Sequence, residues 1–168
     1  MPMTMEKARV TLPSDREVQV TRSFRAPRAL VYRTYSEPDL VRRWLLGPPG
    51  WSMPVCEMDV RVGGRYTWRW RSNDGSEFGF TGIFREVEPA SRVVHTQAYD
   101  PGTLGGGCPA DDAIVTVLFT EEGAATTVTT LIDFGSKEAR DAALSTGMTD
   151  GMEQSYQLLD RLIEGIQR

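Results

Sequence analysis

The feature that most constrains the fold is a run of alternating aromatic and polar residues. Tyr66, Trp68 and Trp70 occupy every second position, with Thr67 and Arg69 between them. Successive side chains on a β-strand point to opposite faces of the sheet, so the three aromatic side chains share one face. The pattern therefore predicts a strand with an aromatic face and a polar, arginine-bearing face.

The turn at residues 73–75 (Asn-Asp-Gly) decides how the next strand pairs with this one. A three-residue loop with Gly75 in the left-handed conformation pairs Ser72 with Ser76. The cross-strand pairs are then Trp70–Phe78, Trp68–Phe80 and Tyr66–Gly82. A two-residue loop would shift the register and place the phenylalanines on the arginine face. Burying each large apolar side chain is worth about 2–3 kcal/mol, which favours the three-residue loop.

A second turn, around Pro89 and Ala90, decides in the same way which residues of the following strand lie on the aromatic face. If Glu88 pairs with Ser91, then Phe84 lies opposite His95. The predicted inner face comprises Tyr66, Trp68, Trp70, Phe78, Phe80, Gly82, Phe84, Val93, His95, Gln97 and Tyr99. Aromatic walls with a gap at Gly82 and a few polar groups are typical of a small-molecule pocket. Filled cores favour aliphatic side chains.

The rest of the chain indicates an α+β arrangement. Residues 1–14 are expected to form a flexible tail and residues 15–168 a single domain. We predict a strand over 16–24, then short helices over 27–36 and 36–46, the second capped by Ser36. The segment LLGPPG between Trp44 and Trp51 is expected to form a pocket mouth or lid. About six strands with hairpin connections follow between Pro54 and Phe134, which predicts an antiparallel sheet.

The last segment, residues 136–168, is predicted to be helical and to hold a long helix with one mostly apolar face. Positions on that face recur at alternating spacings of four and three residues. They are Met148, Met152, Ser155, Leu159, Leu162 and Ile166, with Tyr156 and Ile163 alongside. We expect a curved sheet to hold this helix against its inner face.

Composition argues against several classes of function. A net charge of −4 disfavours nucleic-acid binding. His95 is the single histidine, so a histidine-rich metal site is impossible, and no cofactor motif is present. No apolar run approaches the roughly 20 residues of a membrane span, and no signal-peptide core is visible, so we expect a cytoplasmic protein without membrane binding. Cys56 and Cys108 are interpreted as reduced thiols, and residues 102–109 as a flexible glycine-rich loop.

Four segments resemble the family of activators of heat-shock-protein ATPase homologues. They are VTRSFRAPRALVYRTYSEPDLVRRWLLGP, MDVRVGGRYTW, DGSEFGFTGIFREVEPASRVVHT and STGMTDGMEQSYQLLDRLIEG. This resemblance, over about residues 18–165, implies the helix-grip fold of the START and birch-pollen-allergen (SRPBCC) superfamily. That fold wraps a curved antiparallel sheet around a long C-terminal helix, with a cavity between them. Gly147-Met148 departs from the Gly-Trp pair that the family often has there, and the family shares no catalytic motif.

The predicted function is non-catalytic binding of a hydrophobic, aromatic or polyketide-like small molecule between the sheet and the C-terminal helix. The expected ligand-binding residues are Trp51, Tyr66, Trp68, Trp70, Phe80, Gly82, His95, Gln97, Tyr99, Met148, Met152 and Tyr156. No catalytic residue, metal ligand or cofactor is expected, and the chain is expected to be a monomer or a homodimer.

Two alternatives stay open: a protein-interaction module that resembles the chaperone activators, and a cyclase- or hydrolase-type enzyme using the same cavity. His95 is either a general acid or base, a group that orients a ligand carbonyl, or a buried histidine bonded to Gln97 or Tyr99. A cavity above about 300 Å³ lined by the aromatic face would favour ligand binding. A filled interior with a contiguous apolar surface patch would favour protein interaction.

Overall fold

The computed structural model describes residues 6–103 and 112–168, so the predictions for Cys108 and for most of the glycine-rich loop lie outside the described residues. The strands are β1 (Arg9–Thr11), β2 (Glu17–Phe24), β3 (Trp51–Met58), β4 (Arg65–Ser72), β5 (Glu77–Glu88), β6 (Arg92–Asp100), β7 (Ala113–Glu122) and β8 (Ala125–Asp133). The helices are α1 (Arg28–Ser36), α2 (Pro38–Trp44), α3 (Lys137–Ser145) and α4 (Met148–Gln167). None of the helices in the described ranges has the length and apolarity to cross a membrane.

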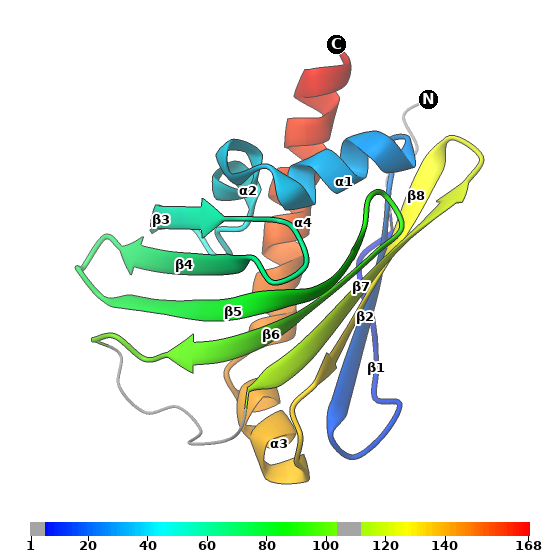
Figure 1. Cartoon of the computed structure of the whole chain (residues 1–168). Helices are drawn as coiled ribbons and strands as arrows, with labels where there is room; N and C mark the ends of the chain where they lie inside the picture. The colour runs from blue at the N-terminus through cyan, green and yellow to red at the C-terminus, as the bar shows by residue number, and fades with distance from the viewer. Residues whose placement is uncertain (1–5, 104–111) are drawn as a thin grey trace.

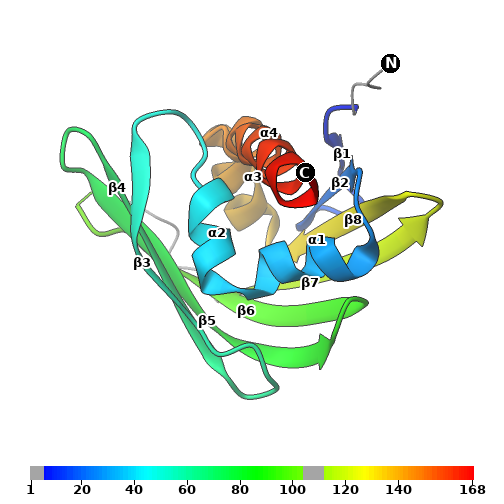
Figure 2. The ribbon, with the colours of Figure 1, turned by 90° about the horizontal axis from the view of Figure 1, so that it is seen from above.

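The strands form one curved antiparallel sheet in the order β1-β2-β8-β7-β6-β5-β4-β3 (Figure 1). Viewed from above, the sheet curves around α4, and α1 and α2 lie across the same concave side (Figure 2). The predicted α+β helix-grip fold is therefore confirmed. Its main core lies between the concave face and the helices, where Phe24, Val31 and Leu159 are fully buried.

The register predicted at the first turn is confirmed. Ser72 donates its backbone N–H to the carbonyl oxygen of Ser76 at 2.9 Å, and Gly75 adopts a left-handed φ of 89°. Consequently the aromatic pairs form as predicted: Tyr66–Gly82, Trp68–Phe80 and Trp70–Phe78. The aromatic side chains of β4 and β5 thus share one face, and the arginines of β4 share the other.

The second turn differs from the prediction, although its main consequence holds. Glu88 pairs with Arg92 and not with Ser91, so the loop is one residue longer than predicted. An irregularity in the ladder between Phe84 and Glu86 shifts the register back by one, and Phe84 lies opposite His95 as predicted. A β-bulge inserts one extra residue into a strand, so it offsets the longer loop.

Two predictions about the N-terminal part are wrong. Residues 9–11 do not belong to a tail, because they form β1 and pair with β2. This pairing satisfies backbone groups that an unprotected edge strand would leave open. Ser36 does not cap α2. It ends α1, where its hydroxyl donates to the carbonyl oxygen of Tyr32 at 2.9 Å, and Glu37 takes the capping position.

The C-terminal segment is helical as predicted but consists of two helices. Ser136 caps α3 by accepting a hydrogen bond from the backbone N–H of Ala139 at 3.1 Å. Gly147, with a left-handed φ of 81°, separates α3 from α4. On the predicted apolar face of α4, Leu159 is fully buried, whereas Met148 and Met152 are half-buried.

A buried arginine fixes α4 to the sheet. The Arg22 side chain extends from β2 into the core and binds the carboxylates of Glu153 at 3.2 Å and Asp160 at 2.8 Å, both on α4. Its guanidinium also lies over the rings of Phe24, at 5.1 Å, and Tyr156, at 5.9 Å. Cation–π contacts and charge-assisted hydrogen bonds thus hold α4 close to the β2 side of the sheet.

Candidate functional site

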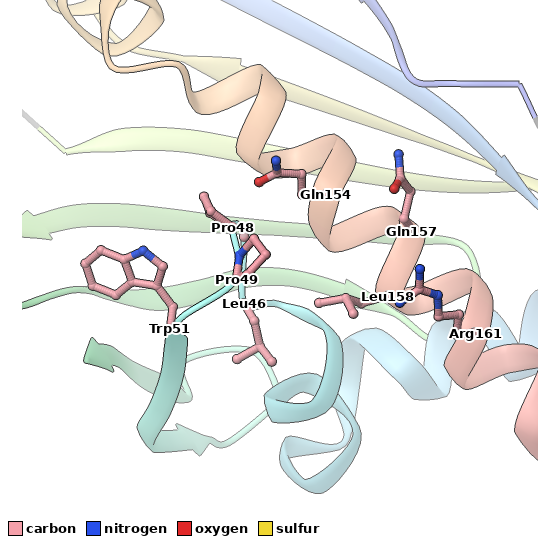
Figure 3. Close-up of a pocket in the computed structure, with 9 residues that line it drawn as sticks. Leu46, Pro48, Pro49, Trp51, Gln154, Gln157, Leu158 and Arg161 are labelled. Carbon is pink, nitrogen blue, oxygen red and sulfur yellow. The ribbon is translucent and has the colours of Figure 1, made fainter. Parts of the chain in front are cut away.

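A cavity of about 400 Å³ opens between the loop that follows α2 and the side of α4 (Figure 3). Its lining residues are Leu46, Gly47, Pro48, Pro49, Trp51, Gln154, Gln157, Leu158 and Arg161. Small-molecule sites in proteins occupy roughly 300–1,000 Å³, so the cavity has the size of such a site. Of the residues predicted to bind ligand, only Trp51 lines it.

The loop wall of this cavity is held in place from two sides. Gly47 donates its backbone N–H to the hydroxyl of Ser155 on α4 at 2.8 Å. The indole N–H of Trp70 on β4 donates to the carbonyl oxygen of Leu45 at 2.6 Å. Trp51 packs edge-on against Phe78, with ring centroids 5.3 Å apart. These contacts pre-form the loop wall, which lowers the entropy cost of binding a ligand.

The second wall is one face of α4. Gln154, Gln157, Leu158 and Arg161 are spaced three, four and seven residues from the first, so they lie on one side of the helix. Figure 3 shows Leu158 turned toward Leu46, with Gln154 and Arg161 on either side of it along α4. The cavity therefore places an apolar loop wall opposite a helix wall that carries polar groups.

A second, much smaller cavity of about 50 Å³ lies below α1 against the predicted aromatic face. Trp68 and His95 line it, together with residues from α1 that include Tyr32 and Tyr35. The indole N–H of Trp68 is buried there and has no hydrogen-bond partner among the described residues. This volume has room for water but not for an aromatic ligand.

Tyr66 explains why the predicted gap at Gly82 is absent. A Cβ atom on Gly82 would lie 2.5 Å from Cε1 of Tyr66 and 2.0 Å from the carbonyl oxygen of Thr96. The Tyr66 ring thus packs directly over Gly82, and its hydroxyl donates to the carbonyl oxygen of Thr96 at 2.6 Å. The β5–β6 pairs on either side of Gly82, Thr81–Ala98 and Phe84–His95, keep the predicted register.

His95 is buried beside Tyr66. Its Nδ1 lies 3.0 Å from the carbonyl oxygen of Thr96 and 3.0 Å from the hydroxyl of Tyr66. A carbonyl oxygen only accepts hydrogen bonds, so Nδ1 carries the proton and donates it. The predicted partners, Gln97 and Tyr99, are replaced by groups on β4 and on the adjacent residue. Burial lowers the pKa of His95 to about 4, against the favourable hydrogen bond to Thr96, so the ring is neutral near pH 7.

Acidification should destabilise the protein through His95. The pKa of His95 is about 4 in the folded protein, against an ordinary value of 6.5 that applies to the unfolded chain. As the pH falls through 6.5, the unfolded chain therefore binds a proton before the folded protein does. The contribution of neutral His95 to the free energy of unfolding is fully present above pH 6.5. It is lost progressively as the pH falls toward the folded-state pKa of about 4. Between about pH 7.5 and about pH 5, the loss should be about 2 kcal/mol. Urea denaturation at both pH values measures it, and His95→Gln should remove this component. Equal pH dependence in both proteins would contradict the buried neutral state.

The other predicted site residues lie in several different environments. Tyr66, Trp70 and Tyr156 are buried core residues. Phe80, Gln97, Met148 and Met152 are half-buried, and Tyr99 is 39% exposed on β6. Trp70 stacks on Phe78 with ring centroids 5.1 Å apart. These residues therefore lie in three environments: the buried core, half-buried positions, and the exposed end of β6.

Sequence reasoning missed most of the residues around the larger cavity, although one signal for it was present. The predicted pocket mouth LLGPPG does provide four of its residues, Leu46, Gly47, Pro48 and Pro49. The residues of α4 were missed because they lie beside the apolar face that the spacing identified. Among the described residues, no cluster of histidine, cysteine, aspartate or glutamate could hold a metal ion.

Solved structures share this fold across nearly the whole chain. A protein from Rhodobacter sphaeroides is 26% identical, with a TM-score of 0.86 and coverage of 95% of this chain and 99% of its own. A protein from Chromobacterium violaceum is also 26% identical, with a TM-score of 0.75 and coverage of 90% and 99%. Protein Ms6760 from Mycobacterium smegmatis is 21% identical, with a TM-score of 0.80 and coverage of 95% and 96%.

No curated protein matches the sequence significantly. The family described as Activator of Hsp90 ATPase homolog 1-like protein matches residues 25–164. That range includes α1, α2, both walls of the larger cavity and most of α4. The chain therefore belongs to the Activator of Hsp90 ATPase homolog 1-like family, within the SRPBCC superfamily.

Proposed function

We propose that this protein binds a small hydrophobic molecule with an aromatic group, without catalysis, in the cavity between the loop after α2 and helix α4. The observation that carries the proposal is a cavity of about 400 Å³ with one apolar wall and one partly polar wall. Ligand sites combine mainly apolar linings with a few polar groups that orient the ligand. Trp51 supplies an aromatic surface on which a ring can stack.

Leu158→Asn should weaken binding about tenfold, because it removes apolar contact from the middle of the α4 wall. The measurement is isothermal titration calorimetry with flavonoid-like and polyketide-like aromatic compounds. Leu12→Asn is the matched control, since Leu12 is 51% exposed and does not line the cavity. Thermal unfolding of both variants checks that each is folded.

The outcomes separate two positions for the ligand. Absence of saturable binding to the wild-type protein would refute the proposed function. If Leu158→Asn binds as well as wild type, and the double variant His95→Leu/Gln97→Met binds more weakly, the ligand lies between the sheet and α4. That second position is the one that the sequence predicted from its aromatic face.

A second candidate, protein interaction, is favoured by the description of the family as activators of a chaperone ATPase. In the described part of the chain, the exposed large apolar residues are Val10, Leu12, Val62, Ile83 and Tyr99. They are divided among the β1 region, the β3–β4 loop with β5, and the end of β6. Addition of the protein to an Hsp90-class chaperone tests this candidate, because stimulation of ATP hydrolysis would support it and an unchanged rate would contradict it.

A further inference from the structure

We propose that the molecule bound in the larger cavity carries an anionic group, such as a carboxylate, and that Arg161 binds it. This inference rests on the proposed function, because it concerns the same cavity. Its class of ligand is an amphipathic anion: an apolar or aromatic body with a negatively charged end.

The charge of the lining is the first observation. Arg161 is the only charged residue among the described residues that line the cavity. The opposite wall consists of Leu46, two prolines, a glycine and Trp51, none of which carries a charge. A guanidinium beside an apolar wall attracts an anion whose body fits that wall, and it can donate two parallel hydrogen bonds to a carboxylate.

The second observation is that two acidic side chains of α4 bind another arginine and not Arg161. Asp160 directly precedes Arg161, but both of its carboxylate oxygens accept hydrogen bonds from Arg22, at 3.2 and 2.8 Å. Glu153 also binds Arg22, through both of its oxygens at 3.2 Å. Arg22 belongs to β2, and Figure 2 shows β2 and α2 on opposite sides of α4.

Arg161 itself forms no ion pair or hydrogen bond with any other described residue, including Glu164 three residues further along α4. Of the two glutamines on the same wall, one has an amide that is free to bind a ligand. Gln157 donates its amide to Glu153 at 3.2 Å, which turns its N–H group away from a ligand, whereas the amide of Gln154 forms no hydrogen bond with described residues. Gln154 lies two helical turns from Arg161, so its amide is left to bind a polar group at the other end of the ligand.

Two probes of nearly the same shape test the proposal: naphthoate, which is ionised near neutral pH, and naphthamide, which is neutral. Wild-type protein should bind naphthoate about five- to tenfold more tightly than naphthamide, because the carboxylate gains a charge-assisted contact. High salt should reduce this preference, since Arg161 is exposed and its field is screened. Arg161→Gln should abolish the preference by weakening naphthoate binding, while Arg161→Lys should retain part of it.

Arg85→Gln is the matched control, because Arg85 is exposed on β5 and does not line the cavity. The substitution changes the net charge of the protein by the same amount as Arg161→Gln. Its preference for naphthoate should equal that of wild type. Equal affinity of wild-type protein for both probes, or a preference that survives in Arg161→Gln, would overturn the inference while leaving the proposed function standing. If wild-type protein binds neither probe and none of the flavonoid-like and polyketide-like compounds, the proposed function itself is refuted.

Discussion

Gly82→Ala should lose about 3 kcal/mol or more of its free energy of unfolding. The added Cβ would lie 2.0 Å from the carbonyl oxygen of Thr96 and 2.5 Å from the ring of Tyr66, and the first of these is a backbone atom. Relief of that overlap requires β5 and β6 to separate where the hydroxyl of Tyr66 binds Thr96. Forced overpacking of a filled core typically costs 1–3 kcal/mol, and a backbone clash adds to that cost.

Gly151→Ala is the matched control for this prediction. A Cβ at Gly151, within α4, would meet no atom within 4 Å. The same substitution should therefore stabilise the protein by about 0.5–1 kcal/mol, because alanine favours a helix interior over glycine. Urea denaturation of both variants provides the comparison. A Gly82→Ala variant as stable as wild type would mean that Tyr66 does not pack over Gly82.

Arg22→Met should cost about 3 kcal/mol of the free energy of unfolding. The substitution leaves the carboxylates of Glu153 and Asp160 close together on α4 without the cation that binds both. Removal of one partner from a buried ion pair typically costs 3–5 kcal/mol. The lower end applies here because the Asp160 side chain is 33% exposed and can be partly solvated. Loss of this contact should also loosen α4, which forms one wall of the larger cavity.

The control variants separate the buried charges from the loss of one arginine. Arg16→Met removes a surface ion pair with Asp133, in which the Arg16 side chain is 58% exposed. It should lower the free energy of unfolding by less than about 1 kcal/mol. The triple variant Arg22→Met/Glu153→Gln/Asp160→Asn should recover much of the loss, because no uncompensated charge remains. Urea denaturation midpoints and slopes provide the measurement. Equal costs for Arg22→Met and Arg16→Met would refute the buried clamp.

The register of the aromatic hairpin could be predicted from local features of the sequence. The alternation of Tyr66, Trp68 and Trp70 and the loop ending at Gly75 are local features, and burial of aromatic area leaves one favourable register. The same reasoning identified the apolar face of α4, because a helical spacing depends on the chain alone. At the second turn, the local information was insufficient, since a longer loop and a bulge near Arg85 offset each other.

The position of the larger cavity could not be predicted from the sequence. A cavity is the space left after elements from distant parts of the chain have packed, so its position depends on long-range contacts. The ring of Tyr66 fills the space expected at Gly82, and the cavity lined by Trp68 and His95 has a volume of only about 50 Å³. Arg22 holds α4 close to β2, and Gly47 binds Ser155, so the larger space of about 400 Å³ forms between the loop and the polar edge of α4. Periodicity could place residues on a face, but only these contacts between β2, α4 and the loop fixed the distances between the faces.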